Sequence, residues 1–384
     1  MRRMTSTKSY ERDTRNVLAM QDEVALAIAK EINVRLTPNE QAHLASAPAV
    51  NPEALDAYLK GLYYLRLVTD DNVAKAIAQF EEAIKLDPNF ASAYAWLALA
   101  YQVAADNEGV YTPAEMMPKE KAAVERAIRL DDNSADAHVA FGEFKMAFEH
   151  DWVGSEREFR RAIELNPNSA GAHDQLGALL AYQGRLDEAL VENQRAQALD
   201  PLNFWVLFDT VQTLTWQGEY EAATHLASTV DIPFMLGWID LQAGKITDAI
   251  PLLQKANAEQ ASPLAAADLG YAYGASGDRI HAMAMIEELN KHSPRGHAQP
   301  YLLAIVYLGM GDHARALDGL EKAYAEHSTL LNLLKMDRIF DPLRSEPRFI
   351  ALMKELNFEE GPWDLKRPSP TSTTGSPRVA TPPI

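Results

Sequence analysis

One phrase of this sequence occurs twice: a proline-containing break that is followed by an alanine-rich helical stretch. Residues 83–102 read AIKLDPNFASAYAWLALAYQ, and residues 162–181 read AIELNPNSAGAHDQLGALLA. Around these breaks, small residues of a first helix, a turn glycine, an alanine of a second helix and a proline recur about every 34 residues. This period predicts stacked helical hairpins, because one hairpin cannot bury its apolar face alone.

Each mark of the pattern has a physical role. Gly177 and Ala189 let the two helices of a hairpin approach closely, and Gly184 can adopt the left-handed turn between them. Pro201 then ends the unit, because it lacks a backbone donor. Apolar residues at helical spacing continue from 54 to 327 without the alternating stretches of β-strands, so we predict an all-α chain. The pattern is clearest in four windows, residues 170–203, 230–262, 263–296 and 297–330.

This pattern resembles the tetratricopeptide repeat (TPR), and the resemblance extends over roughly residues 52–328. It implies an all-α, right-handed superhelical solenoid of about eight TPR-like hairpins. It also implies that the first helix of each hairpin lines a concave, peptide-binding surface. The expected function is therefore that of a noncatalytic scaffold for protein–protein interaction, and we expect no enzyme.

In TPR arrays, the second, fifth, ninth, twelfth and thirteenth positions of each first helix reach a bound peptide. Aromatic residues, which often anchor binding hot spots, occupy many of these positions in the later repeats. The same spacing is typical of core residues, and the segment PLRSEPRFIALMKELNF could also cover them, so both a groove and a core remain open for Trp205 and Trp216. The predicted partner-binding residues are Tyr58, Arg66, Glu143, Asp174, Tyr182, Trp205, Phe208, Gln212, Trp216, Phe234, Trp238, Tyr271 and Tyr301.

The flanks of the array carry a narrower resemblance. Residues 9–45, together with NPEALDAYLKGLYYL and FDPLRSEPRFIALMKEL, resemble the C-terminal part of bacterial signalling proteins that join a cyclase, kinase or winged-helix domain to a TolB-like domain and a TPR array. This implies an alternative function, a regulatory or sensory arm whose output domain is absent from this chain. No catalytic residue of that family can be carried over, and the chain is either freestanding or truncated.

The same reading divides the chain into four parts. We expect an N-terminal helical segment at 1–50 that resembles the end of a TolB-like domain, and the TPR array at 51–328. A C-terminal capping helical segment is expected at 329–361, and a disordered tail rich in proline, serine and threonine at 362–384.

The sequence offers little for chemistry. It contains no cysteine and no GxxxxGK[ST] phosphate loop, so we expect no cofactor. His138 and His173 occupy the same position in successive repeats, but we see no HExxH motif or acidic partner at fixed spacing and expect no metal. The cluster EHD at 149–151 is expected to be a solvated loop, and no group of carboxylates is expected to converge on one pocket.

Charge and hydropathy restrict the partners. A net charge of −18 at pH 7 repels phosphate backbones and anionic lipid, so we expect no nucleic-acid partner. No run of about 18 apolar residues occurs, so we expect no membrane insertion. The first residues, MRRMTSTKSYERDTRN, lack an apolar stretch after the basic residues, so we expect a cytoplasmic protein. The expected partner is a protein or peptide with a basic or apolar segment.

Overall fold

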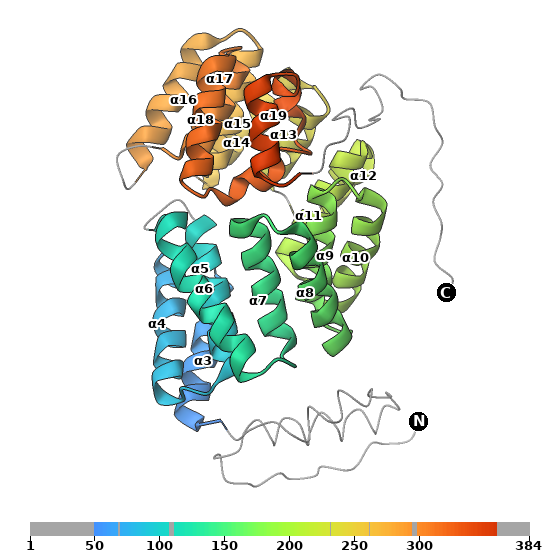
Figure 1. Ribbon diagram of the computed structural model, residues 1–384. Helices are drawn as coiled ribbons and strands as arrows, with labels where there is room; N and C mark the ends of the chain where they lie inside the picture. The colour runs from blue at the N-terminus through green and yellow to red at the C-terminus, as the bar shows by residue number, and fades with distance from the viewer. Residues whose placement is uncertain are drawn as a thin grey trace, which may run out of the picture.

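The computed structural model describes residues 50–67, 70–106, 111–230, 232–260, 262–293 and 298–358. Within these residues the helices α3 to α18 pair into eight hairpins, so the prediction of an all-α solenoid is confirmed (Figure 1). No helix in this part of the chain has both the length and the apolar character needed to span a membrane. The expectations for the N-terminal segment and the Pro/Ser/Thr-rich tail lie outside the described residues.

The hairpins follow one another along the chain. They are α3 (Pro52–Leu65) with α4 (Asp70–Leu86), α5 (Ala91–Asp106) with α6 (Pro113–Leu130), α7 (Ala135–Phe144) with α8 (Trp152–Leu165), α9 (Ala170–Tyr182) with α10 (Leu186–Leu199), α11 (Phe204–Gln217) with α12 (Tyr220–Ala227), α13 (Pro233–Gln242) with α14 (Ile246–Gln260), α15 (Pro263–Ala275) with α16 (Arg279–His292), and α17 (Pro300–Gly309) with α18 (His313–Ala325). The 3-10 helices η3 (Thr329–Leu333) and η4 (Arg338–Leu343) and the helix α19 (Pro347–Glu355) come after them. We call residues 329–358 the C-terminal segment.

Local signals set where the hairpins begin and turn. The side chain of Ser169 caps α9 by accepting a hydrogen bond from the backbone N–H of Ala172 at 3.3 Å. Gly184 and Gly277, each between the two helices of a hairpin, have φ values of 81° and 90°. These values lie in the left-handed region, which glycine adopts at low cost, so the turns form where the pattern predicts them.

Small residues also determine how closely the two helices of a hairpin pack. Gly61 of α3 faces the ring of Phe80 on α4, and Gly142 of α7 faces the ring of Phe159 on α8. A Cβ atom on either glycine would overlap the ring, and both rings are fully buried. The repeat pattern therefore records a direct steric requirement.

The third hairpin contains one irregular turn. Its first helix continues past Phe144 as a π-helix, η2 (Lys145–Glu149), and ends at His150, which has a φ of 48°. A π-turn holds one more residue than an α-turn. The second helix of this hairpin therefore begins one residue later, relative to the first helix, than the repeat pattern would give.

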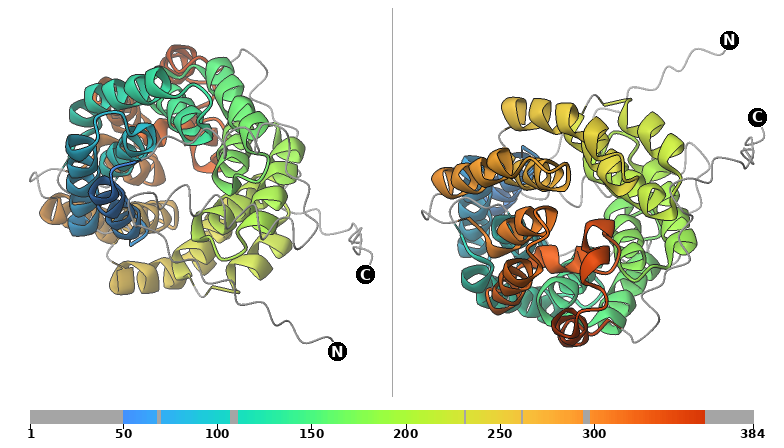
Figure 2. Two further views of the ribbon diagram at one scale, coloured as in Figure 1. Left: turned by 90° about the horizontal axis from the view of Figure 1, so that it is seen from below. Right: turned by 90° about the horizontal axis from the view of Figure 1, so that it is seen from above.

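The hairpins stack into a superhelix whose inner layer consists of the first helices. From α3 to α17, each first helix contacts the first helix of the next hairpin. The views along the superhelix show the hairpins arranged around a centre, with the 3-10 helices of the C-terminal segment inside the ring and α19 at its rim (Figure 2). The array turns far enough for its end to meet its beginning, because η3 contacts both α5 and η2.

Candidate functional site

The candidate site is the concave surface formed by the inner faces of the first helices. The predicted residues on this surface do not form one continuous site. One group contains aromatic residues of five successive first helices, and we call it the aromatic patch. It consists of Tyr182, Trp216, Trp238, Tyr271 and Tyr301.

The rings of the aromatic patch pack against one another and against the core. The Trp216 ring lies edge-on to the Tyr182 ring at a centroid distance of 6.0 Å and to the Trp238 ring at 6.1 Å. Trp216 is 3% exposed and Tyr301 is 1% exposed. The whole patch belongs to, or packs on, an apolar cluster that also contains residues of the C-terminal segment. Trp216 and Tyr301 are thus core residues and not the walls of an open groove.

The C-terminal segment covers the aromatic patch with polar contacts as well. Lys335 Nζ donates a hydrogen bond to the backbone carbonyl of Gln183 at 2.8 Å, where α9 ends. Arg338 Nη1 donates to the Tyr220 hydroxyl at 2.7 Å, and the backbone N–H of Arg338 donates to Gln242 Oε1 at 3.0 Å. Two basic side chains and one backbone N–H of this segment therefore bind polar groups of three different hairpins.

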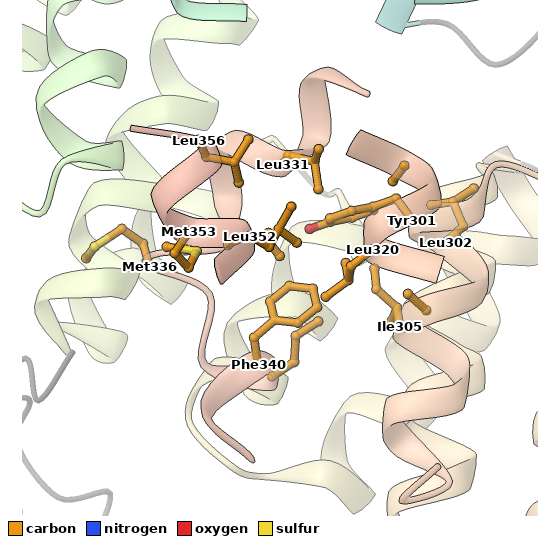
Figure 3. Packing of buried hydrophobic residues seen from close by; sticks show 14 of the residues in the cluster. Tyr301, Leu302, Ile305, Leu320, Leu331, Met336, Phe340, Leu352, Met353 and Leu356 are labelled. Atoms are coloured by element: carbon orange, nitrogen blue, oxygen red, sulfur yellow. The ribbon is translucent and has the colours of Figure 1, made fainter. Parts of the chain in front are cut away.

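Apolar side chains of the C-terminal segment fill the space between these contacts. Phe340 is fully buried, and its ring centroid lies 5.9 Å from that of Tyr301. Leu331 and Leu352 point toward the same space, next to Leu320 of α18 (Figure 3). Because these side chains are buried between elements far apart in the chain, the segment is part of the folded array.

The end of the C-terminal segment binds the third hairpin. Trp152 Nε1 donates to the backbone carbonyl of Leu356 at 2.8 Å, and the Trp152 ring stacks on Phe358 at 4.6 Å. Asn357 Nδ2 donates to the backbone carbonyl of His150 at 3.3 Å. The expectation of a solvated loop is wrong for His150, which is buried, and burial lowers its pKa to about 4.

A second group of residues on the concave surface is acidic. Glu143 of α7, Asp174 of α9 and Asp209 of α11 form what we call the acidic patch. Asp174 is 4% exposed, and its Oδ1 atom has no hydrogen-bond partner. Burial raises the pKa of Asp174 to about 7. Burial also raises the pKa of Asp209 well above its usual range, and the negative charges of Asp174 and Glu143 raise it further.

The expectation that no carboxylates converge is therefore wrong at the acidic patch. The error has a simple origin, because the three residues belong to successive hairpins and meet only in the superhelix. Asp209 is the sixth residue of α11, a position that the predicted set omits, although Phe208 beside it is included. Asp268, the sixth residue of α15, is buried, whereas Asp209 is half-buried, and Asp268 Oδ2 has no hydrogen-bond partner. An acidic residue at the sixth position of a first helix is therefore the sequence signal that could have identified Asp209.

The predicted residues of the first hairpin lie elsewhere. Tyr58 is half-buried, and its ring lies 6.0 Å from that of Phe80 and 5.0 Å from that of Phe90. Arg66 is exposed at the C-terminal end of α3. The structure does not bring either residue to the aromatic patch.

Four further predicted residues belong to α11 and α13. Trp205 is 49% exposed, and its ring lies 6.2 Å from that of the half-buried Phe208. Gln212 is buried on the same helix. Phe234, on α13, is half-buried and packs on two apolar clusters, one formed by the fifth and sixth hairpins and one by the sixth and seventh. Of these four, only Trp205 presents a largely accessible aromatic ring.

The two matching histidines link the helices of their own hairpins. His138 Nδ1 lies 2.8 Å from Glu158 Oε2, and His173 Nδ1 lies 2.6 Å from Glu192 Oε2. Each histidine thus has an acidic partner that the sequence analysis did not identify, and the two glutamates follow at different spacings, 20 and 19 residues. The extra residue of the π-turn accounts for the difference. No group of three or more His, Asp or Glu in the described part of the chain is placed to hold a metal ion.

Comparisons with known proteins agree with this architecture. Residues 72–102 match a family profile described as TPR repeat, and residues 158–191 match one described as Tetratricopeptide repeat. The first match spans parts of α4 and α5, and the second runs from α8 into α10. No curated protein matches the chain.

Solved structures with a similar fold are distant in sequence. The human IFIT1 dimer with m7Gppp-AAAA is 15% identical over 80% of this chain and 77% of that chain, with a TM-score of 0.48. YrrB, described as a TPR protein with an unusual peptide-binding site, is 20% identical over 65% of this chain and 98% of that chain, with a TM-score of 0.29. A tetratricopeptide repeat protein from Parabacteroides merdae is 11% identical over 79% of this chain and 99% of that chain, with a TM-score of 0.36. Two segments of the chain therefore match TPR models, and the described residues form stacked helical hairpins consistent with a TPR solenoid.

Proposed function

We propose that this protein is a noncatalytic scaffold that binds a protein or peptide through its concave surface. TPR repeats typically mediate protein interactions. The observation that carries the proposal is that the concave surface already binds one segment of chain, its own C-terminal segment. That segment is held by Lys335, Arg338 and Phe340.

The part of the surface left for a partner is the region around the acidic patch. Asp174 lies in the second turn of α9, whereas the hydrogen bond from the C-terminal segment is at Gln183, nine residues later. Nine residues span about 13 Å along a helix. The net charge of −18 disfavours a nucleic acid, so the proposed partner is a basic or apolar protein segment, and we place this binding in the cytoplasm.

Photo-crosslinking tests the proposal. A photoreactive phenylalanine derivative would replace either Trp205, which is 49% exposed on the first helix α11, or Val191, which is 64% exposed on the second helix α10. Irradiation in a lysate of the native cell should crosslink a discrete protein at position 205 and not at position 191. Crosslinks at position 191 alone would contradict a concave site, and the absence of crosslinks at both would contradict the scaffold role.

The alternative proposal is a regulatory or sensory arm of a bacterial signalling protein of the cyclase, kinase or transcription-regulator type. It is supported by the resemblance of the flanking segments, and by the fact that FDPLRSEPRFIALMKEL includes most of η4, which contacts the first helices α13 and α17. A segment that occupies the surface from within the same chain is a suitable element for regulation. Sequencing the gene upstream of the Met1 codon tests this alternative, which requires an in-frame cyclase, kinase or winged-helix segment.

A further inference from the structure

The first helix of the array presents an uncovered apolar face. Leu59 and Tyr63 of α3, and Leu67 in the turn after it, are 48%, 62% and 47% exposed. Their spacing of four residues places the three side chains along one face of the helix, and we call them the α3 stripe. Terminal hairpins of a repeat array normally present a polar outer face. An apolar stripe at this end therefore calls for a cover.

The later hairpins show what covers the equivalent face. Tyr63 follows two residues after Gly61, the glycine that faces the second helix of its own hairpin. On α7, α9, α13 and α15, the residue two positions after the corresponding glycine is at most 1% exposed. These residues are Phe144, Leu179, Ile239 and Ala272. Each of these four helices contacts the second helix of the hairpin before it, so Tyr63 occupies a position that a preceding helix covers elsewhere in the array.

The contact at Phe144 shows how such a cover is made. Lys121 of α6, the second helix of the preceding hairpin, places its Nζ atom 5.6 Å from the centroid of the Phe144 ring. Phe144 also belongs to one apolar cluster with Met116 and Val124 of α6. The cover of this face is therefore an amphipathic helix that comes earlier in the chain.

The opposite end of the array already has a cover from its own chain. Helix α19 contacts α18, the second helix of the last hairpin. Arg348 of α19 binds Asp318 and Glu321 of α18, each at 2.7 Å. Leu320 of α18 and Phe349 of α19 are fully buried in one apolar cluster. A helix outside the repeats thus caps one end of the stack.

The chain carries a suitable cover for the other end just before α3. Residues 16–31, NVLAMQDEVALAIAKE, lie outside the described residues. Apolar residues recur in this sequence at the helical spacing of three and four residues, namely Val17, Met20, Val24 and Ile28. As a helix the segment would be about 24 Å long, enough for the α3 stripe of about 12 Å. Residues 32–50 can reach either end of α3, since an extended chain spans about 3.3 Å per residue.

We propose that residues 16–31 form an amphipathic helix that packs its apolar face on the α3 stripe. This helix takes the place that the second helix of the preceding hairpin has at the later hairpins. The α3 stripe then fixes the N-terminal segment to the array. The inference goes beyond the scaffold function and does not depend on it, because the stripe is separate from both patches of the concave surface.

Crosslinking from the α3 stripe identifies what covers it. The chain contains no cysteine, so Tyr63→Cys provides a single thiol for a benzophenone maleimide. Irradiation of the purified full chain should give crosslinks within the same chain, which mass spectrometry locates in residues 16–31. The matched control is Ile280→Cys on α16, where the side chain is 83% exposed, and it should give no crosslink to that segment.

Substitutions in the segment assign the contact to its apolar face. Val24→Asp/Ile28→Asp places two carboxylates against the α3 stripe and should lower the crosslink yield about tenfold or more. Lys30→Asp is the matched control, because it changes the net charge by the same amount at a position away from that face, and the yield should stay unchanged. Circular dichroism checks that the array folds in each variant.

Four results would overturn the inference. The crosslinks could join two copies of the chain, which would make the α3 stripe a dimer contact, or they could fall outside residues 16–31. The yield could be the same in Val24→Asp/Ile28→Asp as in the wild type, or no crosslink could form from Tyr63→Cys. None of these results concerns the concave surface, so crosslinking at position 205 tests the scaffold separately.

Discussion

The aromatic patch and the acidic patch lie on the same concave surface but differ in what covers them. The aromatic patch is covered by the C-terminal segment, which places Phe340 against Tyr301 at 5.9 Å and Lys335 on the end of α9. The acidic patch retains an unpartnered Asp174 oxygen and neighbouring carboxylates of like charge. One patch has its occupant within the chain, and the other contains two aspartates whose pKa values are raised by burial.

The two patches show that a residue on the concave surface can serve either stability or binding, and the repeat pattern does not distinguish these roles. Aromatic residues on a concave surface contribute most to stability when a segment buries them, as Phe340 does at Tyr301. Buried carboxylates of like charge reduce stability, and proteins keep such arrangements mainly at functional sites. We therefore regard the acidic patch, rather than the aromatic patch, as the part of the surface suited to a partner.

The largest expected effect comes from breaking the cover of the aromatic patch. Phe340→Ala removes a fully buried ring that packs on Tyr301 and Phe349, and should lower the free energy of unfolding by about 3–5 kcal/mol. Urea unfolding followed by circular dichroism measures the change.

A matched control separates burial from residue type. Ile280→Ala removes an apolar side chain that is 83% exposed on α16 and should change the free energy of unfolding by less than about 0.5 kcal/mol. Equal effects of Phe340→Ala and Ile280→Ala would mean that the C-terminal segment does not cover the aromatic patch in solution.

The second effect has the opposite sign and tests the acidic patch. The pKa of Asp174 is raised to about 7, so the folded state holds this proton more tightly than the unfolded state, and its ionisation destabilises the fold as pH rises. Asp174→Asn should therefore be more stable than the wild type by on the order of 1–4 kcal/mol at about pH 8, and by less at about pH 5. Thermal unfolding at the two pH values measures this difference.

The control for this prediction is a single exposed acid. Asp248→Asn on α14 should leave stability unchanged at both pH values, because its carboxyl group is exposed. If Asp174→Asn behaved in the same way, the Asp174 carboxylate would have to be solvated or paired in solution, and the contrast between the two patches would disappear.

The smallest expected effect concerns the end of the C-terminal segment. Trp152→Phe removes the hydrogen bond to the Leu356 carbonyl but keeps an aromatic ring next to Phe358, and should cost about 1 kcal/mol. We expect faster proteolysis near residue 356, measured by mass spectrometry of limited digests. Unchanged cleavage in the variant would show that this end of the segment is not held by Trp152.

Sequence reasoning predicted the hairpins well and the site only in part. The turn at Gly184 and the pairing of Gly142 with Phe159 depend on residues close in the chain, so the pattern predicts them. The spacing of Trp216 in the sequence is compatible with either a binding groove or a core, so the sequence does not predict its burial. Asp209 was not selected, because the spacing rule omits the sixth position of the first helix.

The sequence by itself determined that this chain forms stacked TPR hairpins, because turn glycines, helix caps and small packing residues act over distances of one hairpin. Tertiary structure decided which parts of the concave surface are filled. Trp152 meets Leu356 across 204 residues, and Lys335 meets Gln183 across 152 residues. Such contacts depend on the rotation that accumulates from hairpin to hairpin until the end of the array reaches its beginning. A sequence pattern within one hairpin does not specify this total rotation.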